Sequence, residues 1–216
     1  MNDLFTSAFS GLSPTALVIM IAGLFLASLA RGYSGFGFSA VLVASWSLAG
    51  QPVRAVVLAL VMEVTASILQ AVSVWRNVPW KQVVLLLGGA AVGTPVGVHL
   101  LTLLPEPNLR LGIAGFVLIS ALALMSGCKL KRKAAPSSTV GVGILSGICN
   151  GAVAMGGLPV ALFLTADGDS PQRIRAAVVA YFFLLDIMGL FWLTQSGIAT
   201  PLALRDAVLA LPVLVI

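Results

Sequence analysis

Long runs of apolar residues, separated by short polar segments, make up most of this 216-residue chain. About 20 consecutive apolar residues span a bilayer as a helix, so each run predicts a transmembrane segment. The first run, residues 14–48, is too long for one span and short for two, which favours a broken helix or a re-entrant segment. The further predicted spans are residues 53–74, 82–104, 109–127, 139–165, 174–195 and 202–216.

Two glycine-rich motifs lie inside apolar runs, RGYSGFGFS at residues 31–39 and NGAVAMGGLP at residues 150–159. Lipid leaves free backbone N–H and C=O groups unsatisfied, so a broken helix at membrane depth has to face protein or a water-filled cavity. Glycine permits the dihedrals of a break, and the N-terminus of the next half-helix attracts anions. The alternative is close helix packing, since glycine is common in membrane helices.

The motifs are followed by matching sequence at the same distance. Arg54-Ala55 begins 19 positions after Gly35, and Arg175-Ala176 begins 19 positions after Gly156 (54 − 35 and 175 − 156). This match predicts an internal duplication in which equivalent residues are 121 positions apart. Broken helices at corresponding positions of two halves indicate a transport site. The predicted substrate-binding residues are Arg31, Ser34, Gly35, Phe36, Gly37, Ser39, Asn150, Gly151, Gly156, Gly157 and Pro159.

Composition supports an all-α polytopic membrane protein. Hydrophobic residues make up 59% of the chain and charged residues only 9%, against about 25% charged in soluble domains. The net charge of +5 does not indicate nucleic-acid binding, because four basic residues gather in one loop at residues 129–133. By the positive-inside rule this loop is cytoplasmic, which predicts a multi-pass protein of the cell (inner) membrane.

The basic loop also divides the chain. We expect a first transmembrane repeat of about four helices at residues 1–128, a basic cytoplasmic linker at 129–138 and a second repeat at 139–216. We expect the second repeat to be incomplete, with about 35 to 40 residues missing relative to a symmetric four-plus-four protein, so that the sequence is either a fragment or a shortened protein. If residues 139–165 cross the membrane once, the repeats are parallel, and Arg54 and Arg175 lie on the outer side. If that stretch is a hairpin, the repeats are inverted.

Two acidic residues, Glu63 and Asp186, lie near the middle of predicted spans. An ionised side chain at bilayer depth costs about 2.5 to 3.5 kcal/mol on insertion scales, so it usually has a function or a partner. Reversible protonation of one of them would couple transport to protons. The alternative is a permanently protonated or hydrogen-bonded structural carboxyl. The register of 121 does not make the two residues equivalent.

Small residues recur every fourth position in two spans, forming a ridge on each helix. The ridges predict close helix packing and consist of Gly89, Gly93 and Gly97, and of Gly143, Gly147 and Gly151.

At these motifs the chain resembles the TauE/SafE family of membrane permeases. The matching pieces are residues 31–39, Gly93-Thr-Pro-Val-Gly97, 146–151, Met155-Gly-Gly-Leu-Pro-Val160 and Arg175-Ala176. The resemblance implies an eight-helix transporter of sulfite and small organosulfur anions. The family usually has two adjacent prolines after the second glycine pair, and Leu158 replaces the first of them here.

The predicted function is therefore a secondary transporter for sulfite or a small organosulfur or organic anion, coupled to protons. A passive anion channel, a non-transporting membrane subunit and an intramembrane enzyme are the alternatives. No Walker motif, zinc-ligand set or Ser-His-Asp arrangement occurs, so we expect no enzyme activity, cofactor or metal. The expected partners are the anion, protons and the lipid bilayer, not nucleic acid; the sequence leaves a homo-oligomer open.

Overall fold

The structure, a computed structural model, describes residues 13–35, 37–48, 52–126 and 135–199, and every regular element within these ranges is helical. Five helices are long and apolar enough to cross a membrane, namely α2, α4, α5, α6 and α9. The chain is thus an all-α polytopic membrane protein, as the apolar runs predict. The helices are α2 Pro14–Ser34, α3 Phe38–Leu48, α4 Pro52–Val74, the 3-10 helix η1 Trp75–Asn77, α5 Trp80–Leu103, α6 Glu106–Met125, α7 Pro136–Val153, α8 Gly157–Ala166 and α9 Pro171–Gln195.

Some predicted features lie outside the described residues, namely the basic loop at 129–133 and the run at 202–216. The segment predicted as a linker at 129–138 is shorter than expected, because α7 already begins at Pro136. Proline suits the first turn of a helix, where its missing N–H group has no intrahelical acceptor.

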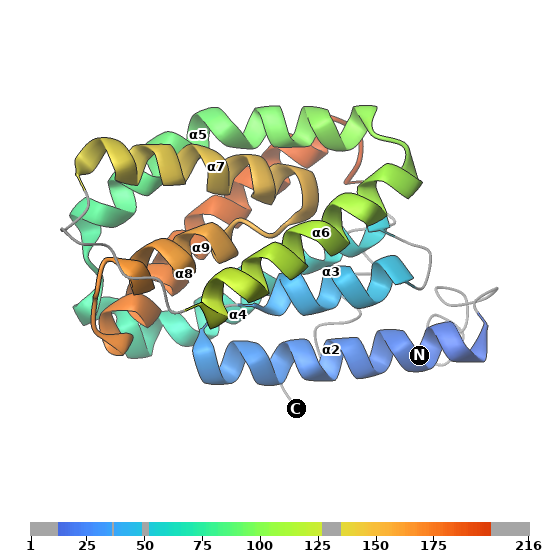
Figure 1. Cartoon of the computed structure of the whole chain (residues 1–216), viewed down its shortest axis with the longest axis horizontal. Helices are drawn as coiled ribbons and strands as arrows, with labels where there is room; N and C mark the ends of the chain where they lie inside the picture. Colours follow the sequence, from blue (N-terminus) through green and yellow to red (C-terminus); the bar gives the residue numbers. More distant parts are fainter. Residues whose placement is uncertain (1–12, 36, 49–51, 127–134, 200–216) are drawn as a thin grey trace.

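Both glycine-rich motifs break the apolar runs into helical hairpins. α2 ends at Ser34 and is followed by Gly35, whose φ of 81° is left-handed, and α7 ends at Val153 and is followed by Ala154, whose φ is 56°. A left-handed residue stops a helix because it turns the chain away from the helix axis. Figure 1 shows that α3 then runs back along α2 and that α8 runs back against α7.

The two hairpins run in opposite directions. The end of α4 shares a hydrophobic cluster with the beginning of α9, where Val74 and Val78 join Ala176 and Ala177. The crossing helices α4 and α9 are therefore antiparallel, as Figure 1 shows. Residues 139–165 accordingly form the hairpin of the two arrangements left open by the sequence. Arg54 and Arg175 lie at opposite ends of the molecule, so the expectation that both face the outer side is wrong.

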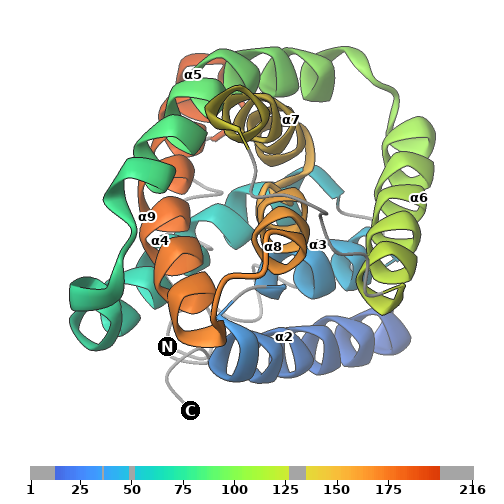
Figure 2. The same cartoon turned by 60° about the vertical axis from the view of Figure 1, so that its left-hand side comes forward.

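The short helices α3 and α8 lie in the interior of the bundle, enclosed by the longer helices (Figure 2). In α8 the side chains of residues 158–161 are all buried, and in α3 Phe38 is fully buried. By contrast, α2 and α6 carry many exposed apolar residues, including Phe25, Leu29 and Leu118. A continuous apolar outer surface of this kind suits contact with lipid acyl chains.

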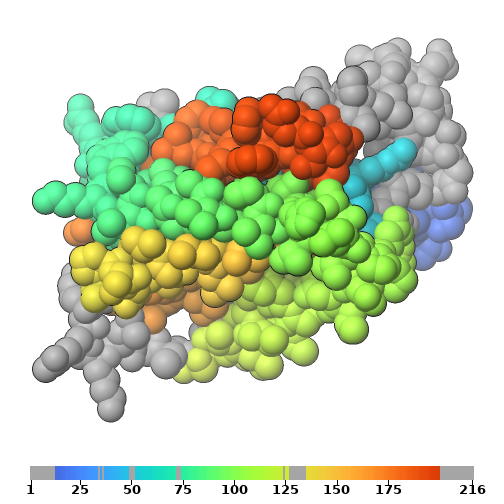
Figure 3. Space-filling model, turned by 90° about the horizontal axis from the view of Figure 1, so that it is seen from above, coloured from blue at the N-terminus to red at the C-terminus, as the bar shows by residue number. Residues whose placement is uncertain are grey.

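The predicted glycine ridges meet each other, since α5 and α7 pack along their whole length. They run parallel, with Gly89 against Val140 and Gly97 against Ile148. A Cβ atom added at either glycine would overlap a backbone carbonyl oxygen of the facing helix. Figure 3 shows α5 lying between α9 and α7 without a gap on this face of the molecule. The contact is therefore backbone against backbone and has no room for side chains.

Adjacent glycines of α5 provide a test of this packing. Gly89→Ala should lower the thermal unfolding midpoint, because overpacking a tight contact costs about 1 to 3 kcal/mol. Gly88→Ala is the matched control, since a Cβ atom there meets nothing within 4 Å. Alanine is about 1 kcal/mol more favourable than glycine in a helix, so Gly88→Ala should be neutral or stabilising. Equal midpoints for both variants in detergent would contradict the close contact.

Candidate functional site

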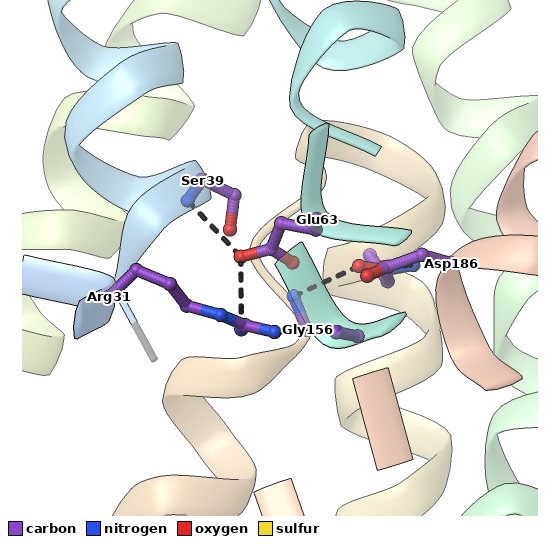
Figure 4. Close-up of polar contacts among 7 residues, drawn as sticks. Arg31, Ser39, Glu63, Gly156 and Asp186 are labelled. Atoms are coloured by element: carbon purple, nitrogen blue, oxygen red, sulfur yellow. Dashed lines mark hydrogen bonds and ion pairs between the residues drawn. The ribbon is translucent and has the colours of Figure 1, made fainter. Parts of the chain in front are cut away.

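Three buried ionisable side chains meet where the two hairpins converge. Arg31 of α2 is 2% exposed, and Glu63 of α4 and Asp186 of α9 are fully buried. The core consists of two hydrophobic clusters, and both α4 and α9 contribute residues to each of them. Glu63 on α4 and Asp186 on α9 lie where each helix passes from one cluster to the other. Figure 4 shows these side chains together with Ser39 and Gly156 from the starts of the two half-helices. Residues of both glycine-rich motifs therefore lie at this cluster (Figure 4).

Glu63 occupies the N-terminus of the half-helix α3. Its Oε1 accepts a hydrogen bond from the backbone N–H of Ser39 at 3.3 Å, and it lies 3.6 Å from Nη1 of Arg31. A helix N-terminus offers unpaired N–H groups and partial positive charge, which a carboxylate satisfies. In this conformation a side chain of the protein therefore holds the place that the sequence suggests for an anionic ligand.

The second half-helix is connected to a carboxyl group through an asparagine. Asn150 donates from Nδ2 to Oδ1 of Asp186 at 3.2 Å and accepts at Oδ1 from the backbone N–H of Gly156 at 3.4 Å. Ser146 donates to the carbonyl oxygen of Gly156, and Tyr181 donates to the Ser146 hydroxyl oxygen at 2.7 Å. This network fixes the break between α7 and α8 to the crossing helix α9.

The two hairpins match element by element at a separation of 119 positions. α8 begins 119 positions after α3 (157 − 38), and α9 begins 119 positions after α4 (171 − 52). The hydrogen bond from Arg31 to Ser67, at 2.6 Å, corresponds to that from Asn150 to Asp186, and each joins residues 36 positions apart. The predicted register of 121 is therefore wrong by two residues. Whether the halves arose by duplication stays a prediction.

The carboxyl groups of Glu63 and Asp186 are turned toward each other (Figure 4) and interact electrostatically. Oε2 of Glu63 and Oδ2 of Asp186 are both buried without a hydrogen-bond donor among the described residues. Two facing acceptors without a donor are an unfavourable arrangement in a low-dielectric interior. A proton on one carboxyl group would provide the missing hydrogen bond.

Arg31 also packs against an aromatic ring. Its guanidinium carbon lies 5.1 Å from the centre of the Phe182 ring, within the range of a cation–π interaction. The same ring fills the space beside Gly157, where an added Cβ atom would overlap it. Gly157 is therefore required here for packing against Phe182, and the ring covers the glycine that was predicted to approach a substrate.

The remaining predicted residues are placed less centrally. Gly35 packs against the aliphatic part of Arg175, and Gly37 has a left-handed φ of 87° with open space at its Cβ position. Gly151 belongs to the contact with α5, and Pro159 is buried in the first turn of α8. Phe36 and the side chain of Ser34 lie outside what the structure describes.

No group of three potential metal-binding side chains occurs in the described ranges. Four residues of this site are not among those predicted from the sequence. The missed residues are Ser67, Ser146, Tyr181 and Phe182. Ser67 and Phe182 lie near the two acidic residues on their helices, four positions from Glu63 and from Asp186 respectively. Residues one helical turn from a buried charge share its face, which is the signal that could have identified them.

The contact between Gly157 and Phe182 predicts a suppressor pair. Gly157→Val should abolish anion flux, because the added side chain displaces the Phe182 ring that packs on Arg31. Combining it with Phe182→Ala removes the overlap and should restore a measurable part of the activity. Gly141→Val is the control, since its Cβ position is open. Flux in liposomes measures the effect; a double variant no better than Gly157→Val would show that the overlap is not the cause.

The comparisons with known proteins agree with this architecture. The sequence profile described as sulfite exporter TauE/SafE matches residues 19–216. Neither the curated proteins nor the solved structures contain a significant match. Since the profile covers most of the chain, including both hairpins and the buried cluster, the chain belongs to the sulfite exporter TauE/SafE family.

Proposed function

We propose that this protein is a secondary transporter that moves sulfite or another small organosulfur or organic anion across the membrane, coupled to protons. The family supports transport of an anion. The observation that carries the proposal is the buried cluster of Arg31, Glu63 and Asp186 at the meeting point of two broken helices. Ionisable groups inside a membrane protein usually mark an ion or substrate pathway.

The charge balance of the cluster explains how protons could be involved. Arg31 contributes one positive charge, whereas Glu63 and Asp186 contribute two negative charges if both are ionised. A buried net charge is unfavourable, so the cluster is most stable with one proton shared by the two carboxyl groups. Among the described residues, the other polar groups near the acids include Ser39, the hydroxyl of Tyr181 and the amide of Asn150, and all three are neutral.

An arriving anion changes this balance. Arg31 is the only arginine or lysine at the cluster in the described ranges, so the anion has to compete with Glu63 for its guanidinium. If the cluster takes up a second proton, so that Glu63 and Asp186 are both protonated, Glu63 releases Arg31. The anion and Arg31 then form a pair that is neutral overall. Each monovalent anion would then move with one proton. Moving one uncompensated charge costs about 2.3 kcal/mol per 100 mV, so this neutralisation matters energetically.

A liposome screen tests the proposal. Purified protein is reconstituted, and uptake of sulfite, sulfoacetate, taurine, sulfate and acetate is measured with and without a pH gradient. Accumulation of at least one anion driven by the pH gradient is expected. Flux that only follows the anion's own gradient would identify a passive channel. Absence of flux for every anion would favour a non-transporting subunit.

Glu63→Gln should separate transport from coupling. Glutamine resembles the protonated carboxyl and leaves Arg31 available to the anion. We expect exchange of labelled anion across the membrane to persist, whereas accumulation after a pH step disappears. Glu106→Gln is the matched control, because Glu106 is exposed and pairs with Arg110 on the surface of α6. A Glu63→Gln protein that still concentrates anion after the pH step would refute coupling through Glu63.

Arg31 can be tested independently of folding. Arg31→Gln alone should unfold at lower temperature, because removing one partner of a buried ion pair costs about 3 to 5 kcal/mol. The double variant Arg31→Gln, Glu63→Gln removes both charges and should recover most of the thermal stability. It should nevertheless fail to exchange labelled anion, since the cationic partner is absent. Wild-type exchange by the double variant would rule out Arg31 as the anion's partner.

A further inference from the structure

A small cavity lies beside Arg31, between α2 and α4. Its volume is about 120 Å³, and its walls include Ser28, Arg31, Phe38, Leu69 and Gln70. One water molecule takes up about 30 Å³ in the liquid, so the cavity has room for a few non-hydrogen atoms. This is the size of a small oxyanion.

The chemistry of the walls favours a negatively charged ligand. Of the described residues that line the cavity, Arg31 alone is charged. Its Nε is buried without a hydrogen-bond partner in the described part of the chain, while Nη2 donates to Ser67 and Nη1 lies beside Glu63. A guanidinium binds oxyanions through pairs of neighbouring N–H groups, and the Nε edge is the one without a partner.

Gln70 provides a second polar group at this cavity. It lies three positions after Ser67 on α4, which puts both residues on the same side of the helix. A glutamine side chain offers two N–H donors. Ser28 is less suited, because its hydroxyl donates to the carbonyl oxygen of Leu24 at 2.9 Å. Gln70 is half-buried and lies five positions before η1.

Two further cavities lined by described residues fit an anion less well. A larger cavity of about 420 Å³ is lined by Lys81 and Arg173 but also by Asp167 and Asp169, so its charges of opposite sign cancel. A third cavity, between α4 and α9, is lined almost entirely by apolar residues such as Val179 and Phe183. Neither combines a buried arginine edge with neutral donors.

We propose that the transported anion binds in the cavity between α2 and α4, on the Nε edge of Arg31, with Gln70 as a second donor that helps to select it. Arg31 then lies between two competing anions, the substrate on one side and Glu63 on the other. This inference rests on the proposed function and adds to it the position of the substrate and a residue outside both glycine-rich motifs.

A charge series at Gln70 tests the inference. Sulfite binding is measured by calorimetry with the full-length protein in detergent at low salt, where charge effects are least screened. Gln70→Lys should bind sulfite about tenfold more tightly than the wild type, and Gln70→Glu about tenfold more weakly, because the new charge faces the anion in a partly desolvated site. Gln195→Lys and Gln195→Glu are the matched controls, since Gln195 is an exposed glutamine at the end of α9.

Two outcomes would overturn the inference. Unchanged affinities of both Gln70 variants would place the anion elsewhere, and a loss in both, with lowered unfolding midpoints, would give Gln70 a structural role. In either case sulfite flux by the wild type in liposomes would leave the proposed function intact. A wild-type protein that neither binds nor transports sulfite, or any other anion of the screen, would overturn both proposals.

Discussion

The interaction on which this structure depends is the buried ion pair between Arg31 and Glu63, 3.6 Å apart. Each of these charges would be costly to bury alone, so each requires the other to remain ionised in the interior. The pair also joins three elements, because Arg31 lies in the last turn of α2, Glu63 lies within α4, and the same carboxylate accepts the backbone N–H of Ser39 in the first turn of α3. Electrostatics therefore holds the first hairpin closed around its break.

In the second hairpin the break between α7 and α8 is held by hydrogen bonds of Asn150, and no ion pair among the described residues takes part. Asn150 stands at the position that matches Arg31, and Asp186 stands at the position that matches Ser67. The charged and neutral partners are thus exchanged between the hairpins, while the geometry of the contact is kept. The result is one arginine facing two carboxyl groups at the centre of the molecule. This asymmetry makes the cluster responsive to a proton or an anion, whereas a cluster with balanced charges would need neither.

Much of the fold could be predicted from the sequence, because apolar runs and glycine-rich breaks follow directly from the need to satisfy backbone groups in lipid. The register was wrong because the Arg-Ala pairs at Arg54 and Arg175 suggested an alignment that the helix starts do not follow. Pro52 and Pro171 are the first residues of α4 and α9, and the left-handed residues Gly35 and Ala154 terminate α2 and α7. The spacing of four residues from Asp186 could place Phe182 on the same helix face, but its contact with Arg31 could not be predicted, since that depends on how α9 lies against α2.

The fold is held together by two kinds of contact that differ in how readily they can be replaced. The contact between α5 and α7 is backbone against backbone, with glycines at Gly89, Gly93 and Gly147, so neither helix can slide or rotate without overlap. The polar contacts at the centre are of another kind: one ion pair, a few hydrogen bonds and the Phe182 ring over Arg31, set within an apolar core. Polar contacts can be exchanged for those to a bound anion and a proton, whereas tight backbone packing has no substitute. Of the contacts described here, those of Arg31 are therefore the ones that a bound anion and a proton could replace.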